Sequence, residues 1–182
     1  MSSLCVFLGS KPGASQIYGK ATQALGWELA RHGITCVYGG SYTGLMKILA
    51  DSVLEAKGTA IGVTVQALKD KENFHPGLTE LHVVETMHQR KAMMESLADG
   101  FIVLPGGIGT FEEFFEVFTL MHLGFHAKPC GILNINNYFN PLDDLLGMAE
   151  REGFLKSTLR AKLLRADSPA EMVRMMCERL SA

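Results

Sequence analysis

The segment Pro105-Gly-Gly-Ile-Gly-Thr110 ends an apolar run, and two carboxylates, Glu112 and Glu113, follow it almost at once. Small residues before a helix expose backbone N–H groups, which favour a phosphate or another anion. A carboxylate repels such an anion unless it points elsewhere, and adjacent side chains differ by about 100° around a helix. We therefore expect one carboxylate to reach beyond the anion, where it could bind sugar hydroxyls, activate water or stabilise positive charge on a sugar.

A basic pair, Arg90 and Lys91, lies near the start of the preceding helix-like segment, with His88 beside it. The planar guanidinium of arginine matches phosphate or carboxylate. On local evidence alone, a solvated surface pair is the favoured explanation, and a lone histidine near a helix start is more often structural than catalytic. The histidines form no H-x-x-x-H pair within one helix, because Gly124 separates His122 from His126, so a metal site has no support.

Short apolar runs must position these residues, and longer helix-like segments separate the runs. The runs cover residues 4–9, 35–40, 59–65, 81–85, 101–107 and 130–135. Strands that alternate with helices predict an α/β fold, here a Rossmann-like doubly wound parallel sheet of about six or seven strands with helices on both faces. Ligands of such folds bind beyond the carboxyl ends of the strands. Three of those ends carry glycine-rich loops, at 9–15, 38–44 and 105–110.

The segment after the third glycine-rich loop has the pattern of a helix that packs on the sheet. It is predicted to begin at Gly109 or Thr110, with both glutamates in its first turn. Acidic residues there interact favourably with the helix dipole, by about 0.3–1 kcal/mol each. Aromatic and apolar side chains recur at helical spacing and are predicted to face the sheet: Phe111, Phe114, Phe115, Phe118 and Met121.

Composition favours one domain, residues 1–182, because 182 residues with 47% hydrophobic content can bury one sizeable core. The net charge of −2 has no block of like charges, so the expected partner is a small molecule and not a nucleic acid. The four cysteines form no C-x-x-C pair, which argues against a zinc ribbon or redox dithiol. No signal peptide and no apolar run of ~18 residues appears, so we expect a cytoplasmic protein with no membrane partner.

The glycine-rich loops do not match the two best-known nucleotide motifs. The first loop reads Gly9-Ser-Lys-Pro-Gly13, and the second strand ends in Tyr38-Gly39-Gly40 without the acidic residue of a Rossmann dinucleotide site. No G-x-x-x-x-G-K-[ST] string is present either. These sequences disfavour an NAD enzyme and a P-loop NTPase. They leave a mononucleotide-sized site, with simple turn glycines as the alternative.

Two motifs carry a resemblance to a known family. Residues 105–113 read P-G-G-x-G-T-x-x-E, and residues 87–91 read M-H-x-R-K. With further similarity in "CVFLGSKPGAS", "VYGGSYTGLM" and "LGFHAKPCGILNINNYFNPL", the chain resembles the Lonely Guy (LOG) family of nucleoside 5′-monophosphate phosphoribohydrolases, often mislabelled lysine decarboxylases. The resemblance implies a homodimer without metal or organic cofactor. It also implies hydrolysis of the N-glycosidic bond of AMP or a cytokinin riboside 5′-monophosphate to free base and ribose 5-phosphate.

Carried over by motif, Arg90 and Glu113 look like the catalytic pair. In this hypothesis Glu113 stabilises the oxocarbenium-like ribose and orients or deprotonates water, while Arg90 holds Glu113 and stabilises charge as the base departs. By an ungapped match, Glu72 resembles a family carboxylate near the nucleotide. The other expected substrate-binding residues are Gly9, Ser10, Gly39, Gly40, Met87, Lys91, Gly106, Gly107, Gly109, Thr110, Glu112 and Thr119.

The sequence departs from the family pattern in its second loop, where Ser41 replaces a glycine and Lys47 replaces another. Two alternative functions follow. A non-catalytic nucleotide- or molybdenum-cofactor-binding protein shares related glycine-rich architecture, although the presence of both Arg90 and Glu113 favours the enzyme. A pyridoxal-phosphate-dependent lysine decarboxylase needs a Schiff-base lysine, which the sequence does not identify.

Overall fold

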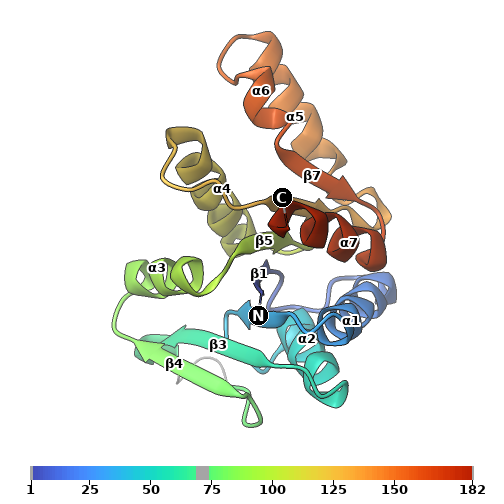
Figure 1. Ribbon diagram of the computed structural model, residues 1–182, viewed down its shortest axis with the longest axis vertical. Helices are drawn as coiled ribbons and strands as arrows, with labels where there is room; N and C mark the ends of the chain where they lie inside the picture. Colours follow the sequence, from blue (N-terminus) through green and yellow to red (C-terminus); the bar gives the residue numbers. More distant parts are fainter. Residues whose placement is uncertain (1, 69–73, 182) are drawn as a thin grey trace.

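A computed structural model describes residues 2–68 and 74–181. Its seven described strands form one parallel sheet in the order β4-β3-β2-β1-β5-β6-β7 (Figure 1). The strands are β1 (Ser3–Phe7), β2 (Thr35–Tyr38), β3 (Ala60–Val65), β4 (Glu80–Val84), β5 (Gly100–Val103), β6 (Cys130–Leu133) and β7 (Leu163–Ala166). The predicted α/β class and parallel sheet are therefore confirmed.

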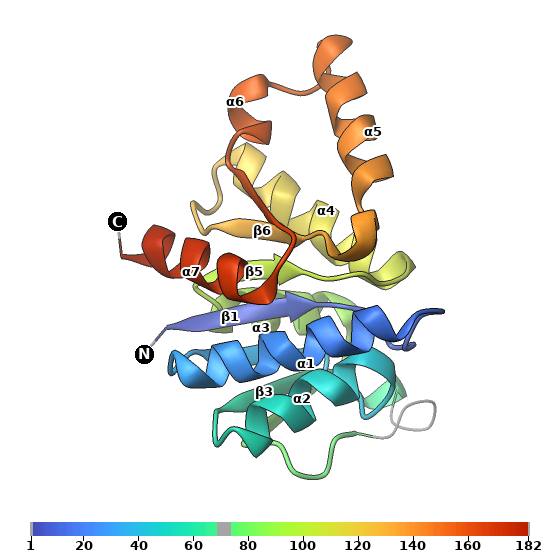
Figure 2. The ribbon, with the colours of Figure 1, turned by 90° about the vertical axis from the view of Figure 1, so that its right-hand side faces the viewer.

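Helices cover both faces of this sheet (Figures 1 and 2). On one face, α1 (Gln16–Arg31), α2 (Gly44–Glu55) and α7 (Pro169–Leu180) bury apolar side chains such as Leu25, Leu49 and Met172. The other face is covered by α3 (Met87–Leu97), α4 (Ile108–Leu123), α5 (Asn140–Arg151) and the short α6 (Ser157–Arg160). Because helices cover both sides, the interior strand β5 is buried along its whole length and reads as a continuous apolar run.

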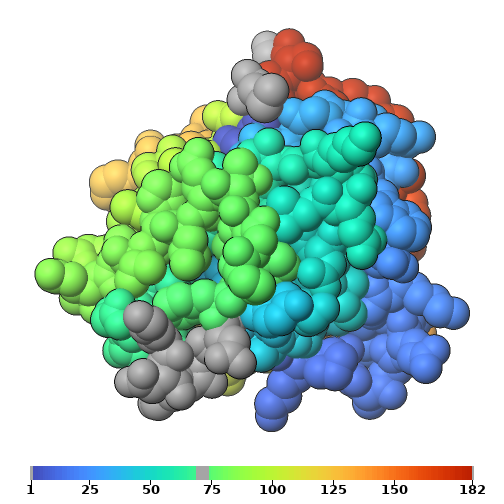
Figure 3. Space-filling model, turned by 90° about the horizontal axis from the view of Figure 1, so that it is seen from below, coloured from blue at the N-terminus to red at the C-terminus, as the bar shows by residue number. Residues whose placement is uncertain are grey.

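The two edges of the sheet differ in how they are covered. At one edge, β4 leaves Leu81 and Val83 partly exposed, and the surface there consists of β4 and α3 (green) beside α2 (cyan) in Figure 3. At the other edge, α5 and α6 project beyond β7 (Figure 2). The strand β7 was not among the six predicted runs because Leu163–Ala166 is short and interrupted by the exposed Arg165. Within the described segments, no helix is both long and apolar enough to cross a bilayer.

Helix α4 begins earlier than predicted. Its N-cap is Gly107, in an extended conformation, and Ile108 is the first helical residue. Counted from Ile108, Glu112 and Glu113 are the fifth and sixth residues, so their predicted place in the first turn is wrong. Glycine has no side chain that could cap a helix. The sequence therefore does not distinguish Gly107 from Gly109 as the last residue before the helix.

The predicted sheet-facing side of α4 is only partly correct. Phe114, Phe118 and Met121 are buried in the core between α4 and the sheet. Phe111 is half-buried, and Phe115 is 39% exposed. Phe115 follows Phe114 directly and is therefore turned by about 100°, away from the sheet.

Candidate active site

The glycine-rich loops converge at the point where the strand order reverses, between β1 and β5. The backbone N–H of Gly9, after β1, donates a hydrogen bond to the carbonyl of Pro105, after β5, over 3.2 Å. The second glycine-rich loop, residues 38–44 after β2, also reaches this point, because a Cβ on Gly44 would overlap the backbone of Ser10. This crevice is where ligands of open α/β sheets bind.

A cavity of about 490 Å³ opens at this crevice. That volume lies within the range of small-molecule sites. The residues that line it come from the loops after β1 and β5, from α1, α2, α3 and α4, and from the segments after β3 and β6: Leu8, Gly9, Ser10, Lys11, Gly13, Tyr18, Leu45, Met46, Leu68, Arg90, Pro105, Gly106, Gly107, Ile108, Gly109, Thr110, Glu113 and Tyr138.

The N-terminus of α4 presents free N–H groups to the cavity. The first backbone bond of the helix runs from Phe111 N to Gly107 O at 3.1 Å, so the preceding amides have no acceptor within the helix. No side chain caps this end. A Cβ on Gly107 or Gly109 would meet no heavy atom within 4 Å, whereas a Cβ on Gly106 would overlap the Thr110 side chain. The loop is tightly packed at Gly106 and open at Gly107 and Gly109, as an anion site requires.

Arg90 and Glu113 meet at the inner part of the cavity. Nη1 of Arg90 donates to Oε1 of Glu113 over 3.1 Å, and Nε of Arg90 donates to the carbonyl of Val63 over 2.9 Å. Both side chains are only 7% exposed. A capping box at Thr86 begins α3 and so sets the position of Arg90 on it. Gly39 leaves room for the guanidinium, because a Cβ there would overlap Nη2 of Arg90.

Burial dominates the electrostatics of Glu113. It raises the pKa of this carboxyl to about 7, against the opposing effect of the Arg90 cation. The negative charge of Glu112 adds a smaller upward shift in the pKa. Glu113 therefore changes its protonation near neutral pH, which suits a group that transfers protons.

The structure separates the two glutamates of the motif. Glu113 lines the cavity, whereas Glu112 points to solvent with 52% of its side chain exposed and pairs with Lys91. Lys91 also pairs with Glu116 at 2.9 Å. These contacts belong to the outer surfaces of α3 and α4, outside the cavity lining.

Some of the other expected substrate-binding residues line the cavity, and others do not. Gly9, Ser10, Gly106, Gly107, Gly109 and Thr110 line the cavity. Gly39 and Gly40 are buried beside it, Met87 is 43% exposed and Thr119 is exposed, so these four lie outside the lining. Glu72 lies outside the described residues. Among residues 2–68 and 74–181, no three His, Cys, Asp or Glu side chains are grouped as metal ligands.

The sequence reasoning missed Tyr138, Tyr18 and Lys11, all of which line the cavity. Tyr138 lies within the similar segment "LGFHAKPCGILNINNYFNPL", but it belongs to neither motif and follows β6, which the motif analysis did not use. The available signal was the pair of asparagines before it, because asparagine tolerates the left-handed turns that redirect a chain.

Comparisons with known proteins extend over almost the whole chain. The family described as "Possible lysine decarboxylase" matches residues 46–176. The cytokinin riboside 5′-monophosphate phosphoribohydrolase of Rhodococcoides fascians is 47% identical over 163 residues, which are 89% of this chain and 82% of that protein. The enzyme of the same name from Arabidopsis thaliana is 40% identical over 173 residues, 95% of this chain and 81% of its own.

Solved structures share the fold. The molybdenum cofactor binding protein of Rippkaea orientalis superimposes with a TM-score of 0.75 at 18% identity, covering 98% of this chain and 97% of that chain. At this identity the likeness shows the fold alone. The family match and the relatives show more: this chain belongs to the Lonely Guy (LOG) family of cytokinin riboside 5′-monophosphate phosphoribohydrolases.

Proposed function

We propose that the chain is a nucleoside 5′-monophosphate phosphoribohydrolase. It uses water to cleave the N-glycosidic bond of AMP or of a cytokinin riboside 5′-monophosphate, releasing the base and ribose 5-phosphate. The observation that carries this proposal is the buried Arg90–Glu113 pair in the same cavity as the open N-terminus of α4. The relatives at 40–47% identity are named for this reaction.

In the proposed binding mode, the phosphate is held at the start of α4. The N–H groups of Ile108, Gly109 and Thr110 are free of helical acceptors and interact favourably with an anion, aided by the helix dipole. Thr110, Gly9 and Ser10 line the same cavity. Apolar side chains from Leu45, Met46 and Leu68 offer a surface for the base.

In the proposed reaction, the ionised Glu113 stabilises positive charge that develops on the ribose as the bond to the base breaks. The carboxylate also orients the water and accepts its proton, while the water oxygen bonds to the anomeric carbon. The base leaves with the electron pair of the broken bond and takes up a proton. Arg90 favours the ionised form of Glu113 and holds it at 3.1 Å, so it acts by positioning and charge.

The assembly and compartment are part of the same proposal. We propose a homodimer in the cytoplasm. Partly exposed apolar side chains on α4 and α5, namely Phe115, Leu123, Leu145 and Met148, support contact with a second copy. The four cysteines are all free, which supports a reducing compartment. Sedimentation of the purified chain tests the dimer.

Release of free base tests the proposed activity. AMP, GMP, CMP and isopentenyl-AMP are incubated with the wild type, with Glu113→Gln and with Glu116→Gln, and free base is separated and quantified. We expect release by the wild type and by Glu116→Gln, whose side chain lies on the outer surface of α4 with 36% exposure. Glu113→Gln should be inactive with an intact fold. Retained turnover in Glu113→Gln would contradict the role of Glu113, and binding of AMP without any base release would favour the non-catalytic alternative.

A further inference from the structure

Tyr138 makes a direct contact with the glycine-rich loop after β5. Its hydroxyl donates a hydrogen bond to the carbonyl of Gly106 over 2.5 Å, although the two residues are 32 positions apart. Tyr138 also lines the cavity. The contact therefore joins the segment after β6 to the loop after β5 where an anion would bind.

The carbonyl of Gly106 belongs to the same planar peptide as the N–H of Gly107. A hydrogen bond that holds the carbonyl on one side also holds that N–H on the opposite side. A rotation of this peptide would bring a carbonyl oxygen towards the anion and take an amide away, which is unfavourable for a negatively charged ligand. Gly106 is not stiffened by a side chain of its own, so an external contact is needed to hold its peptide plane.

The ring of Tyr138 is itself held in place. It packs edge-on against Tyr18 with ring centroids 5.9 Å apart, and parallel to Phe111 at 6.4 Å. The two preceding residues, Asn136 and Asn137, have left-handed φ angles of 54° and 60°. Consecutive left-handed residues without glycine are unfavourable, and surrounding contacts must hold them.

Asn134 supplies the nearest of those contacts. Its side chain is buried, accepts a hydrogen bond from the backbone N–H of Phe139 over 2.7 Å and donates to the side chain of Asn140 over 3.0 Å. It thus spans the turn that carries Tyr138. These hydrogen bonds within the turn hold Tyr138 at a defined position.

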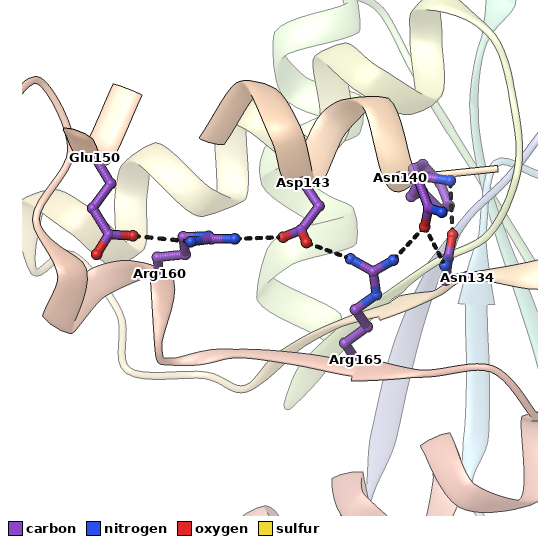
Figure 4. A network of polar contacts seen from close by, with 7 residues as sticks. Asn134, Asn140, Asp143, Glu150, Arg160 and Arg165 are labelled. Carbon is purple, nitrogen blue, oxygen red and sulfur yellow. Dashed lines mark hydrogen bonds and ion pairs between the residues drawn. The ribbon is translucent and has the colours of Figure 1, made fainter. Parts of the chain in front are cut away.

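A chain of ion pairs continues this network along α5 to α6 (Figure 4). Arg165 of β7 donates to Asn140 over 2.6 Å and pairs with Asp143 at 2.8 Å. Asp143 pairs with Arg160 of α6 at 3.0 Å, and Arg160 pairs with Glu150 at 3.1 Å. The turn is therefore anchored to β7, α5 and α6, all of them outside the cavity.

We propose that Tyr138 is a positioning residue for the phosphate of the substrate. It holds the Gly106–Gly107 peptide so that the amides at the start of α4 face the anion, and the Asn134–Asn140–Arg165 network holds Tyr138. This inference rests on the proposed function, because it assumes that the ligand carries a phosphate.

The first test compares Tyr138→Phe with Tyr42→Phe. The first variant removes only the hydroxyl that contacts Gly106. The control removes a tyrosine hydroxyl outside the cavity lining, where the Tyr42 ring packs against His75. Binding of ribose 5-phosphate is measured by calorimetry, and KM and kcat are measured for AMP. We expect the dissociation constant and KM to rise together by about 5- to 10-fold in Tyr138→Phe, as loss of one good hydrogen bond predicts, with kcat nearly unchanged.

The readouts separate positioning from a merely structural role. Loss of folded protein would lower kcat and leave KM and the dissociation constant unchanged, and this result would overturn the proposal. Equal binding of ribose 5-phosphate by Tyr138→Phe and the wild type would also overturn it. If the wild type releases no base from any nucleotide, the proposed activity fails, and the calorimetry still tests the role of Tyr138 in binding the phosphate.

The second test addresses the network. Asn140→Ala removes the oxygen atom that Asn134 and Arg165 share as an acceptor. We expect it to weaken binding of ribose 5-phosphate by about 2-fold in the wild-type background and to have no further effect in Tyr138→Phe, because both changes act through the same contact. Fully additive effects would overturn the link between the network and Tyr138.

Discussion

The guanidinium of Arg90 on α3 meets the carboxylate of Glu113 on α4 at 3.1 Å, in a part of the cavity where both side chains are 7% exposed. Burial and the ion pair act in opposite directions on Glu113, and burial is the larger effect. The carboxyl therefore stays close to the point of protonation at neutral pH. Several outcomes depend on this balance.

Arg90→Ala should raise the pKa of Glu113 further, because burial then acts without an opposing cation. At pH 7 the carboxyl should be mostly protonated, and release of adenine from AMP should fall by at least about 100-fold. Part of the activity should return at higher pH. The pH dependence of base release measures this, with Arg174→Ala as control, since Arg174 is an exposed residue paired with Glu178 on α7. A variant with a higher KM and normal kcat would make Arg90 a phosphate ligand instead.

The wild type should show a rising pH profile with an inflection near pH 7. The proposed reaction needs ionised Glu113, and the pKa of this group is raised to about 7. Below that value, kcat/KM for AMP should fall by about tenfold for each pH unit. A profile without an inflection between pH 6 and 8 would contradict the assignment of Glu113 as the essential carboxylate.

The stability of the fold should also depend on the ionisation of Glu113, but it should fall with rising pH, whereas the activity should rise. The folded pKa of Glu113 is about 7 and the ordinary value is 4.5, so the folded state binds more protons between these values. The stabilisation is fully present below pH 4.5 and is lost as pH rises through 7, by an amount on the order of 3 kcal/mol. The variant Glu113→Gln has no ionisable side chain at this position, so it should not lose stability in this way as pH rises.

The free energy of unfolding in urea, measured at pH 5 and pH 8 for both proteins, tests this linkage. The difference in stability between Glu113→Gln and the wild type should shift in favour of the variant as pH rises. An equal difference at both pH values would show that the pKa of Glu113 is not raised in the folded state.

Two neighbouring glycines should respond differently to alanine. A Cβ on Gly106 would overlap the Thr110 side chain and lie 2.8 Å from the N atom of Gly9, whereas a Cβ on Gly107 would meet nothing within 4 Å. Gly106→Ala should therefore destabilise the protein by about 1–3 kcal/mol, the usual cost of overpacking. Gly107→Ala should change stability by less than about 1 kcal/mol. Thermal unfolding compares the two, and equal losses would contradict the tight packing behind the loop.

Much of the fold was predictable because its signals are local. Short apolar runs identified six of the strands, and the alternation of strands with helices indicated a parallel sheet. The same local signals did not predict correctly which way a single side chain points. Phe115 fits the helical spacing, yet it is 39% exposed, because the sheet covers only part of the circumference of α4.

By itself, the sequence determined the α/β class and the three loops at the strand ends, and two motifs predicted Arg90 and Glu113 as a catalytic pair. Only the tertiary structure brought Arg90 within 3.1 Å of Glu113 and placed the Tyr138 hydroxyl against the carbonyl of Gly106. The physical reason is that these facts depend on contacts between elements far apart in the chain. The direction of a side chain on a helix and its burial are set by the neighbouring elements that pack around it, and a pattern within one segment does not contain them.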